Sequence, residues 1–435
     1  MRPFLIAAFA SLATLASAAS AASAADQPTP RTLRLEDAVR LSAAAAPVGM
    51  ARLDAAIARA NLGAERVALL PQLDATVGWV RRRSYLQVDN QPLSLTPDNT
   101  VDARLRLGQA LIDIDSLHRT RAAGQRAGAA NALAAQALEE SAANAAAAYV
   151  DLVRARALSE VRGGDLKLAE ELASLAKAQV DAGAVEGIAL TRASTRVAEA
   201  RTALAIAQGD EQGAAITLAT ALALDPGTPL VAGDALGDTL GTSRAAETVA
   251  QALIDAASQR PELLAAVANV VAAEEDRRAA GGARLPRVDG FADGGRSGPT
   301  ADDTVTTWQV GVQVTIPLLD RRPWDQQAAA LAAARERIRL DDLRRQIAAQ
   351  VRGSLVGLET GRAALVSASD GKRLAEREVS EARARFTAGA AGNFELIDAQ
   401  RSLSRAGEAL VAAQDGVAQA RVRLARAVGV ATSLR

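Results

Sequence analysis

Residues 285–320 alternate apolar and polar side chains, unlike the Ala-rich segments on either side of them. In the second half of this stretch, one face would carry Trp308, Val310, Val312, Val314 and Ile316, and the other Gln309, Gly311, Gln313 and Thr315. Because Pro317 cannot donate a hydrogen bond to a strand ladder, it ends the strand. The pattern predicts a β-hairpin over residues 286–317 with one apolar face.

The same layout occurs earlier in the chain. Leu70-Pro71 corresponds to Leu285-Pro286, and residues 111–113 (Leu-Ile-Asp) correspond to residues 318–320 (Leu-Leu-Asp). A first hairpin is therefore predicted over residues 72–112, with strands at about 73–80 and 101–111 and a polar loop between them.

The third of the four strands is ambiguous. Asp289, Phe291 and Asp293 fall on one face of a regular strand. Either Phe291 points to the polar side of the sheet, or the strand contains a bulge. The sequence leaves both readings open.

Each hairpin is followed by a long segment without proline. Residues 114–180 predict a helix or helix pair of about 65 residues, roughly 100 Å long at 1.5 Å per residue. A turn at Gly183 leads to a returning helix over 188–222, and the second copy has the equivalent helices around Gly389. Pro47 breaks the helix before the first hairpin, and Pro261 holds the same place before the second.

The chain is thus predicted to be an internal duplication. Its domains would be a signal peptide at 1–25, a linker at 26–34 and a connector at 225–248 between two repeats. The first repeat would span 35–224 (helix, hairpin 72–112, helices 114–222), and the second 249–430 (helix, hairpin 286–317, helices 324–428). The signal peptide is expected because an apolar core at 3–15 precedes the small residues Ala22-Ser23-Ala24.

Composition narrows the function classes. Apolar residues are 49% but aromatics only 2%, which suits closely packed helices better than a bulky core. Fifty basic and fifty acidic residues cancel, so a nucleic-acid partner is not expected. With no Cys and with His118 as the single His, neither a transition-metal site nor a cofactor is predicted, and no catalytic cluster is present. An enzyme is therefore not expected.

The strands have the length and pattern of outer-membrane strands. Strands of about ten residues with one apolar face can cross a bilayer when tilted. Four strands cannot close into a barrel, and an open sheet in lipid would leave the backbone groups at its edges unpaired. Three chains would therefore combine their strands into one barrel of twelve. A soluble sheet packed on helices is the alternative. Trp79, Trp308 and Trp324 all fall at the predicted membrane interfaces, which favours the membrane reading.

The polar strand face would line water. Its candidate lumen-lining residues are Asp74, Asp102, Arg104, Arg106 and Gln313, which could instead pair between strands. Arg81-Arg82-Arg83 with Tyr85 would meet the outer leaflet, where these residues could contact lipid phosphates or remain in a solvated loop.

The whole pattern resembles the TolC family of outer-membrane efflux proteins. The resemblance rests on Leu70-Pro71 and Leu285-Pro286, on the strand exit at residues 316–320, and on the two glycine turns. Leu190/Ala193 follow the first turn and Leu396/Ala399 the second. The chain departs from the pattern at the first strand exit, where Ala110 replaces proline, and it lacks the N-terminal Cys that carries a lipid in some members.

The resemblance implies a mainly α-helical fold with a membrane β-barrel. In a homotrimer, a twelve-stranded barrel with four strands per chain would continue into a long periplasmic α-helical barrel. It also implies a passive exit duct of a tripartite efflux or type I secretion system. Its partners would be a periplasmic adaptor (membrane fusion) protein and an inner-membrane pump of RND, ABC or MFS type, with outer-membrane lipid around the barrel. Gly183 and Gly389 would form the tip that docks the adaptor.

The resemblance also implies a gate. By spacing from Gly389, the two acidic positions at the family's periplasmic entrance match Glu395 and Asp398, whereas the first repeat has Ala189 and Arg192 there. Residues three apart share a helical face, so a trimer would bring six carboxylates together and favour bound cations. Asp398 could instead pair with Arg401 or Arg192. A periplasmic coiled-coil adaptor or scaffold without a barrel is the alternative function.

Overall fold

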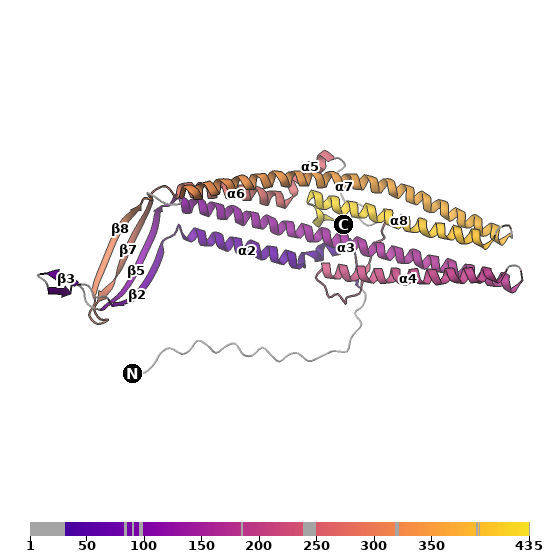
Figure 1. Cartoon of the computed structure of the whole chain (residues 1–435), viewed down its shortest axis with the longest axis horizontal. Coiled ribbons are helices and arrows are strands. Elements are labelled where there is room, and N and C mark those ends of the chain that lie inside the picture. Colours follow the sequence, from indigo (N-terminus) through magenta and orange to yellow (C-terminus); the bar gives the residue numbers. More distant parts are fainter. Residues whose placement is uncertain are drawn as a thin grey trace, which may run out of the picture.

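Two copies of one structural unit lie side by side along a long axis (Figure 1). The computed structural model describes residues 31–81, 85–88, 91–94, 99–183, 186–237, 249–317, 322–388, 390 and 392–434. The first copy comprises α1 (Leu35–Leu41), α2 (Ala46–Val67), β2 (Gln72–Arg81), β5 (Asn99–Ile112), α3 (Ile114–Asp181) and α4 (Gly187–Ala221). The second comprises α5 (Val249–Gln259), α6 (Pro261–Gly282), β7 (Arg287–Gly298), β8 (Val305–Thr315), α7 (Arg322–Thr387) and α8 (Asn393–Val428). The predicted fold class, mainly helical with two duplicated strand pairs, is confirmed.

The two copies match closely in their helix lengths. The long helices α3 and α7 have 68 and 66 residues, and their returning partners α4 and α8 have 35 and 36. Helices α2 and α6 both have 22 residues. In each copy the two shorter helices pack along different parts of the long one. Residues 114–181 form one continuous helix, which decides between the helix and the helix pair that the sequence allowed.

Proline sets the break in the helix before each hairpin. In the first copy, α1 passes through a short 3₁₀ helix, Ser42–Ala44, and α2 starts with Pro47 in its first turn. In the second copy, Pro261 is the first residue of α6. Both positions suit proline, because a first-turn residue has no intrahelical acceptor for its N–H group.

The four main strands form one antiparallel sheet in the order β2-β5-β7-β8. The pairing of β5 with β7 joins the two copies, and the sheet lies at the opposite end of the molecule from the helix turns (Figure 1). Among the residues described, β2 and β8 each have a neighbouring strand on one side only. The sheet is therefore open at both edges.

Three predicted irregular segments contain strands. In the predicted linker at 26–34, β1 (Arg31–Leu33) pairs in parallel with β6 (Leu230–Ala232) of the predicted connector. In the predicted polar loop of the first hairpin, β3 (Tyr85–Val88) pairs with β4 (Gln91–Ser94). No strand had been expected in these three segments. Residues 1–25, the expected signal peptide, lie outside the described residues.

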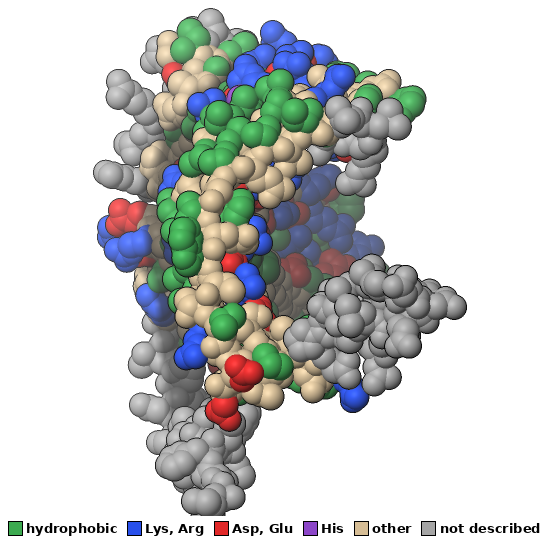
Figure 2. Space-filling view, turned by 90° about the vertical axis from the view of Figure 1, so that its left-hand side faces the viewer, with side chains coloured by type: hydrophobic (Ala, Val, Ile, Leu, Met, Phe, Trp, Pro, Cys, Tyr) green, Lys and Arg blue, Asp and Glu red, His purple; other side chains and the backbone are tan. Residues whose placement is uncertain are grey.

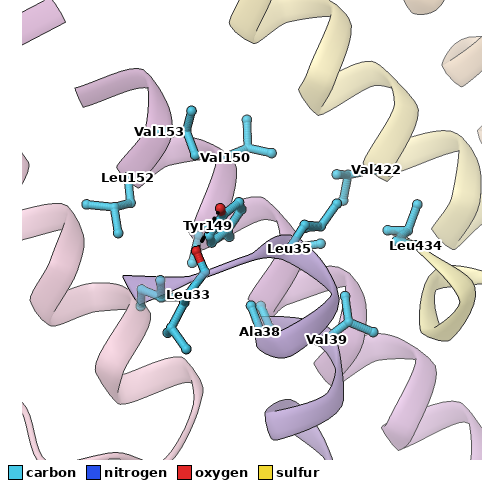
Figure 3. Packing of buried hydrophobic residues seen from close by; sticks show 14 of the residues in the cluster. Leu33, Leu35, Ala38, Val39, Tyr149, Val150, Leu152, Val153, Val422 and Leu434 are labelled. Carbon is cyan, nitrogen blue, oxygen red and sulfur yellow. Dashed lines mark hydrogen bonds between the residues drawn. The ribbon is translucent and has the colours of Figure 1, made fainter. Parts of the chain in front are cut away.

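The largest core cluster surrounds Tyr149, which is fully buried in the middle of α3 (Figure 3). The same cluster includes Leu35 and Val39 of α1 and Val422 of α8. Much of the neighbouring surface of α3 is alanine, including Ala142, Ala145 and Ala146. Small side chains allow helices to approach closely, which explains the high alanine content.

Two further clusters lie along the long axis. One joins α5, α6, α7 and α8, and the other joins α3, α7 and α8 near the helix turns, around Leu172, Phe386 and Leu396.

Within the described chain, no single helix is both long and apolar enough to cross a bilayer. The pair Leu35–Ala44 and Ala46–Val67, bent by 43°, meets that test of length and composition only when the two helices are taken together.

Candidate functional site

The sheet has one continuous apolar face. The pairing registers place the alternating apolar residues of β2, β5 and β8 on the same side. These residues are Leu73, Val77, Trp79, Leu105, Leu107, Trp308, Val310, Val312 and Val314, and their exposed fractions run from 43% to 83%. Exposed apolar area of this extent marks a surface that contacts lipid or another protein.

The opposite face of the sheet is polar. Asp74, Asp102, Arg104, Arg106 and Gln313 all lie on it. Arg104 Nε lies 2.9 Å from Asp102 Oδ1, and Arg104 Nη1 lies 3.0 Å from Asp293 Oδ1 on the next strand. Arg104 therefore pairs with a carboxylate of the neighbouring strand, whereas the lumen-lining role of these residues stays a prediction. Seen from the sheet end, hydrophobic side chains run along the sheet, and basic and acidic side chains line the hollow beside it (Figure 2).

The ambiguity of the third strand is resolved by β7. Phe291 lies on the polar face, opposite Gly108 of β5 and Gly311 of β8. A Cβ at Gly311 would lie 2.9 Å from Phe291 Cζ, so the ring occupies the space that glycine leaves. The Arg106 guanidinium lies 5.5 Å from the ring centroid, within cation–π range. A register shift between Ala110 and Ile112 is present as well.

The three tryptophans lie near strand ends. Trp79 is opposite Val101 and Trp308 is opposite Gly294, both on the apolar face. Trp324 is in the first turn of α7 and is 73% exposed. All three side chains are exposed in the single chain, as a position at a lipid interface requires.

The far end of the molecule consists of the two helix turns (Figure 1). Gly183 follows α3 with φ +71°, and a Cβ there would find no atom of the described chain within 4 Å. The backbone angle, not crowding, therefore favours glycine at this position. Gly389 lies outside the described residues, next to Ala390, whose N–H donates to Arg385 O at 2.9 Å.

The two acidic positions have different surroundings. Glu395, in the first turn of α8, lies 2.9 Å from Arg385 Nη1 of α7. Asp398 is exposed and makes no ion pair with any described residue. Arg401, its expected alternative partner, instead lies 3.6 Å from Glu199 of α4.

Polar contacts join α3 to α8 above the turns. Arg162 Nη1 lies 2.8 Å from Glu408 Oε1, and the Ser404 hydroxyl donates to Asp165. The buried Gln400 also reaches the Leu168 carbonyl oxygen at 3.5 Å. No sequence pattern predicted this cluster, because its members come from different repeats.

The single histidine contacts a glutamate of a neighbouring helix. His118 Nδ1 lies 2.6 Å from Glu275 Oε2, across the contact between α3 and α6. Arg278 contacts the same carboxylate. Among the described residues, no group of three His, Cys, Asp or Glu side chains could hold a metal ion.

Comparison with known families agrees with this geometry. The model of the outer membrane efflux protein family matches residues 39–224 and 252–430, one segment for each repeat. The chain therefore belongs to the outer membrane efflux protein family. It is an outer-membrane efflux channel protein that extends into the periplasm, and the family is one of channels and not of enzymes.

Solved structures with the same fold include three bacterial outer membrane proteins. The Campylobacter jejuni CmeC outer membrane channel is 18% identical with a TM-score of 0.77, over 91% of this chain and 86% of that one. Vibrio cholerae VceC is 16% identical with a TM-score of 0.79, over 91% of this chain and 96% of that one. The Neisseria gonorrhoeae MtrE outer membrane channel, in its open state, is 21% identical with a TM-score of 0.77, over 91% of this chain and 89% of that one. No curated protein sequence matches the chain.

Proposed function

We propose that three copies of this chain close their sheets into one twelve-stranded barrel, and that the assembly is the exit duct of a tripartite efflux or type I secretion system. The observation that carries the proposal is the open antiparallel sheet with one exposed apolar face and two free edges. In a bilayer each unpaired backbone group costs several kcal/mol, so the strands need partners from other copies.

The two faces of the sheet then have separate roles. The apolar face contacts outer-membrane lipid, with Trp79, Trp308 and Trp324 at the interfaces. The polar face lines the water-filled lumen with Asp74, Asp102, Arg104, Arg106 and Gln313. Below the membrane, the long helices continue the duct into the periplasm. The protein is passive, so the energy for transport comes from a pump.

The helix turns form the periplasmic tip. Gly183 and Gly389 would dock a periplasmic adaptor, which couples the channel to an inner-membrane pump of RND, ABC or MFS type. The position of the turns supports this docking role, because they lie farthest from the sheet and Gly183 is exposed with open space around it. Glu395 and Asp398 would form the gate just above the turns.

An adaptor or scaffold without a barrel is the competing function. Such a protein would need the helices but not an exposed apolar sheet face. The match of both repeats to the outer membrane efflux protein family also argues against it.

Reconstitution tests the duct. The purified protein should have the native mass of a trimer, and it should form ion-conducting pores in planar bilayers. A monomeric protein without conductance would contradict the proposal.

A tip substitution tests docking separately. At φ +71° a side chain is strained, and a charged residue at Gly183 would also occupy the proposed contact surface. The G183D variant should keep its trimer yield and pore conductance while losing adaptor cross-linking and transport. Gly209, helical and remote from the turn, is the matched control in G209D. Normal adaptor cross-linking in G183D would exclude the docking role.

A further inference from the structure

The two free edges of the sheet are complementary. Strand β2 has 10 residues and β8 has 11, and the order of antiparallel strands makes β2 and β8 run in opposite directions. We infer that β8 of one copy pairs antiparallel with β2 of the next in a single register, with Val312 directly opposite Ala75. This inference rests on the trimer proposed above and specifies the contact that closes it.

The faces limit which registers are possible. Directly opposed residues of an antiparallel pair point to the same side of the sheet. The residues on the apolar face have even numbers in β8 and odd numbers in β2. Every allowed register therefore pairs an even residue of β8 with an odd residue of β2, and neighbouring allowed registers differ by two residues.

The ends of the strands select one register. With Val312 opposite Ala75, Thr315 lies opposite Gln72 and Thr306 lies opposite Arg81, so every residue of β2 has a partner. Moving β8 by two residues in one direction leaves Gln72 and Leu73 unpaired, and moving it in the other leaves Arg81 unpaired. Because unpaired backbone groups are costly in lipid, the fully paired register is favoured.

Side-chain contacts across the seam agree with this register. It places Trp308 directly opposite Trp79, and cross-strand aromatic pairs are favourable. Val310 then faces Val77, and Val314 faces Leu73, so the apolar face continues across the contact. On the polar face, Gln313 lies opposite Asp74, which brings no like charges together.

The resulting barrel has a normal strand tilt. A row of paired residues that begins at Thr76 passes Arg104, Gly295 and Thr307, and it returns in the next copy at Val80. Three copies accumulate a stagger of about twelve residues over twelve strands. At about 3.3 Å per residue and 4.8 Å between strands, this corresponds to a tilt of roughly 35°. Outer-membrane barrels have tilts of about 35–45°.

Cysteine pairs can read the register directly, because the natural chain has no cysteine. The V312C substitution is combined in one chain with L73C, A75C or V77C. Opposed residues have Cα atoms about 4.5–5.5 Å apart, whereas positions displaced by two residues are about 7–8 Å apart, too far for an unstrained disulfide. Within one chain β5 and β7 separate the two positions, so a disulfide reports contact between copies.

After oxidation in the membrane, A75C/V312C should give a covalent trimer in denaturing gels, with a yield at least about tenfold above the other two pairs. Single-cysteine variants and native mass measurements verify assembly. Stronger cross-linking of L73C or V77C would overturn the register while leaving the proposed channel intact. Native trimers without any disulfide would overturn the β8–β2 contact. Monomers throughout would instead refute the proposed trimer itself.

Discussion

The Tyr149 hydroxyl donates a hydrogen bond of 2.7 Å to Asp234 Oδ2, in the middle of the molecule. The same carboxylate oxygen accepts the Leu35 N–H at 3.0 Å, and the hydroxyl lies 3.0 Å from Leu33 O. Burial, together with the Asp234 carboxylate, raises the pKa of Tyr149. One side chain of α3 thus holds the N-terminal strand and the segment between the repeats together.

Replacing Tyr149 by phenylalanine should destabilise this junction. The Y149F variant keeps the buried ring but leaves the Asp234 carboxylate with one donor fewer, a loss of about 1–3 kcal/mol. The thermal denaturation midpoint of the purified protein should fall, while pore conductance at 25 °C stays normal. Y85F, in β3 at the sheet end of the molecule, is the matched control. An unchanged midpoint in Y149F would show that the hydrogen bond does not stabilise the fold.

The local alternation of side chains predicted both hairpins and most of the sheet faces. It failed for β7, because Gly290, Ala292 and Gly294 in the middle of its apolar face give no hydrophobic signal. Phe291 then stood out on the polar face, where Gly108 and Gly311 make room for it. Gly311 faces Phe291 within one hairpin, but the position of Gly108 opposite Phe291 depends on the pairing of β5 with β7 between the two repeats.

The junction around Tyr149 could not be predicted for a related reason. Strands β1 and β6 have three residues each and lie about 200 positions apart. Such short strands carry no periodic pattern, and their pairing is set by the packing of α1 and α3. The contacts of Arg162 and Asp165 with α8 are likewise created by the assembled helices. The assignment of Glu395 and Asp398 to the gate, by contrast, rests on spacing from Gly389 alone and stays a prediction.

A charge on the apolar face of β8 should be far more costly than one on its polar face. Val312 lies opposite Gly290 on the apolar face, and its neighbour Gln313 lies opposite Asp289 on the polar face. The V312R variant should lose about 2–4 kcal/mol of folding free energy near the bilayer midplane, whereas Q313R should be tolerated. Urea titration of the protein folded into lipid vesicles measures the difference. Equal stability of the two variants would contradict the assignment of the faces.

Two carboxylates in the helical body should make stability depend on pH. Burial raises the pKa of Asp415 on α8, and the nearby Asp151 of α3 raises it further, against the effects of Arg154, Gln419 and Arg423. Burial also raises the pKa of Asp151, although Gln419 Nε2 donates to it at 2.9 Å. Within the described chain, Asp415 Oδ1 is buried without a hydrogen-bond partner.

The direction of the pH effect on stability follows from the raised pKa of Asp415. The folded state binds the proton more tightly than the unfolded chain, whose aspartate pKa is about 3.9. Ionisation of Asp415 therefore lowers stability as pH rises from about 4 through the folded pKa. D415N should raise the denaturation midpoint at pH 7, and the gain should shrink as the pH falls towards 4. D370N, an exposed carboxylate on α7, is the control. A gain that does not vary with pH would refute this explanation.

The last prediction concerns Glu395 and Asp398 at the tip. The structure gives them unequal roles, because Arg385 Nη1 lies 2.9 Å from Glu395, while Asp398 is exposed without an ion pair among the described residues. In a trimer, three Asp398 carboxylates would carry uncompensated charge towards the lumen. We therefore expect Asp398 to contribute more than Glu395 to cation binding at the entrance.

Single-channel recording measures this difference. D398A should reduce cation selectivity and relieve block by trivalent cations more than E395A does, and the double variant should reduce both properties most. R385A should act in the opposite direction, because it frees the Glu395 carboxylate. D341A removes an exposed carboxylate in the half of α7 that is nearer the sheet, and it serves as the control. If D398A and the double variant keep the selectivity and block of the natural channel, these residues are not its cation filter.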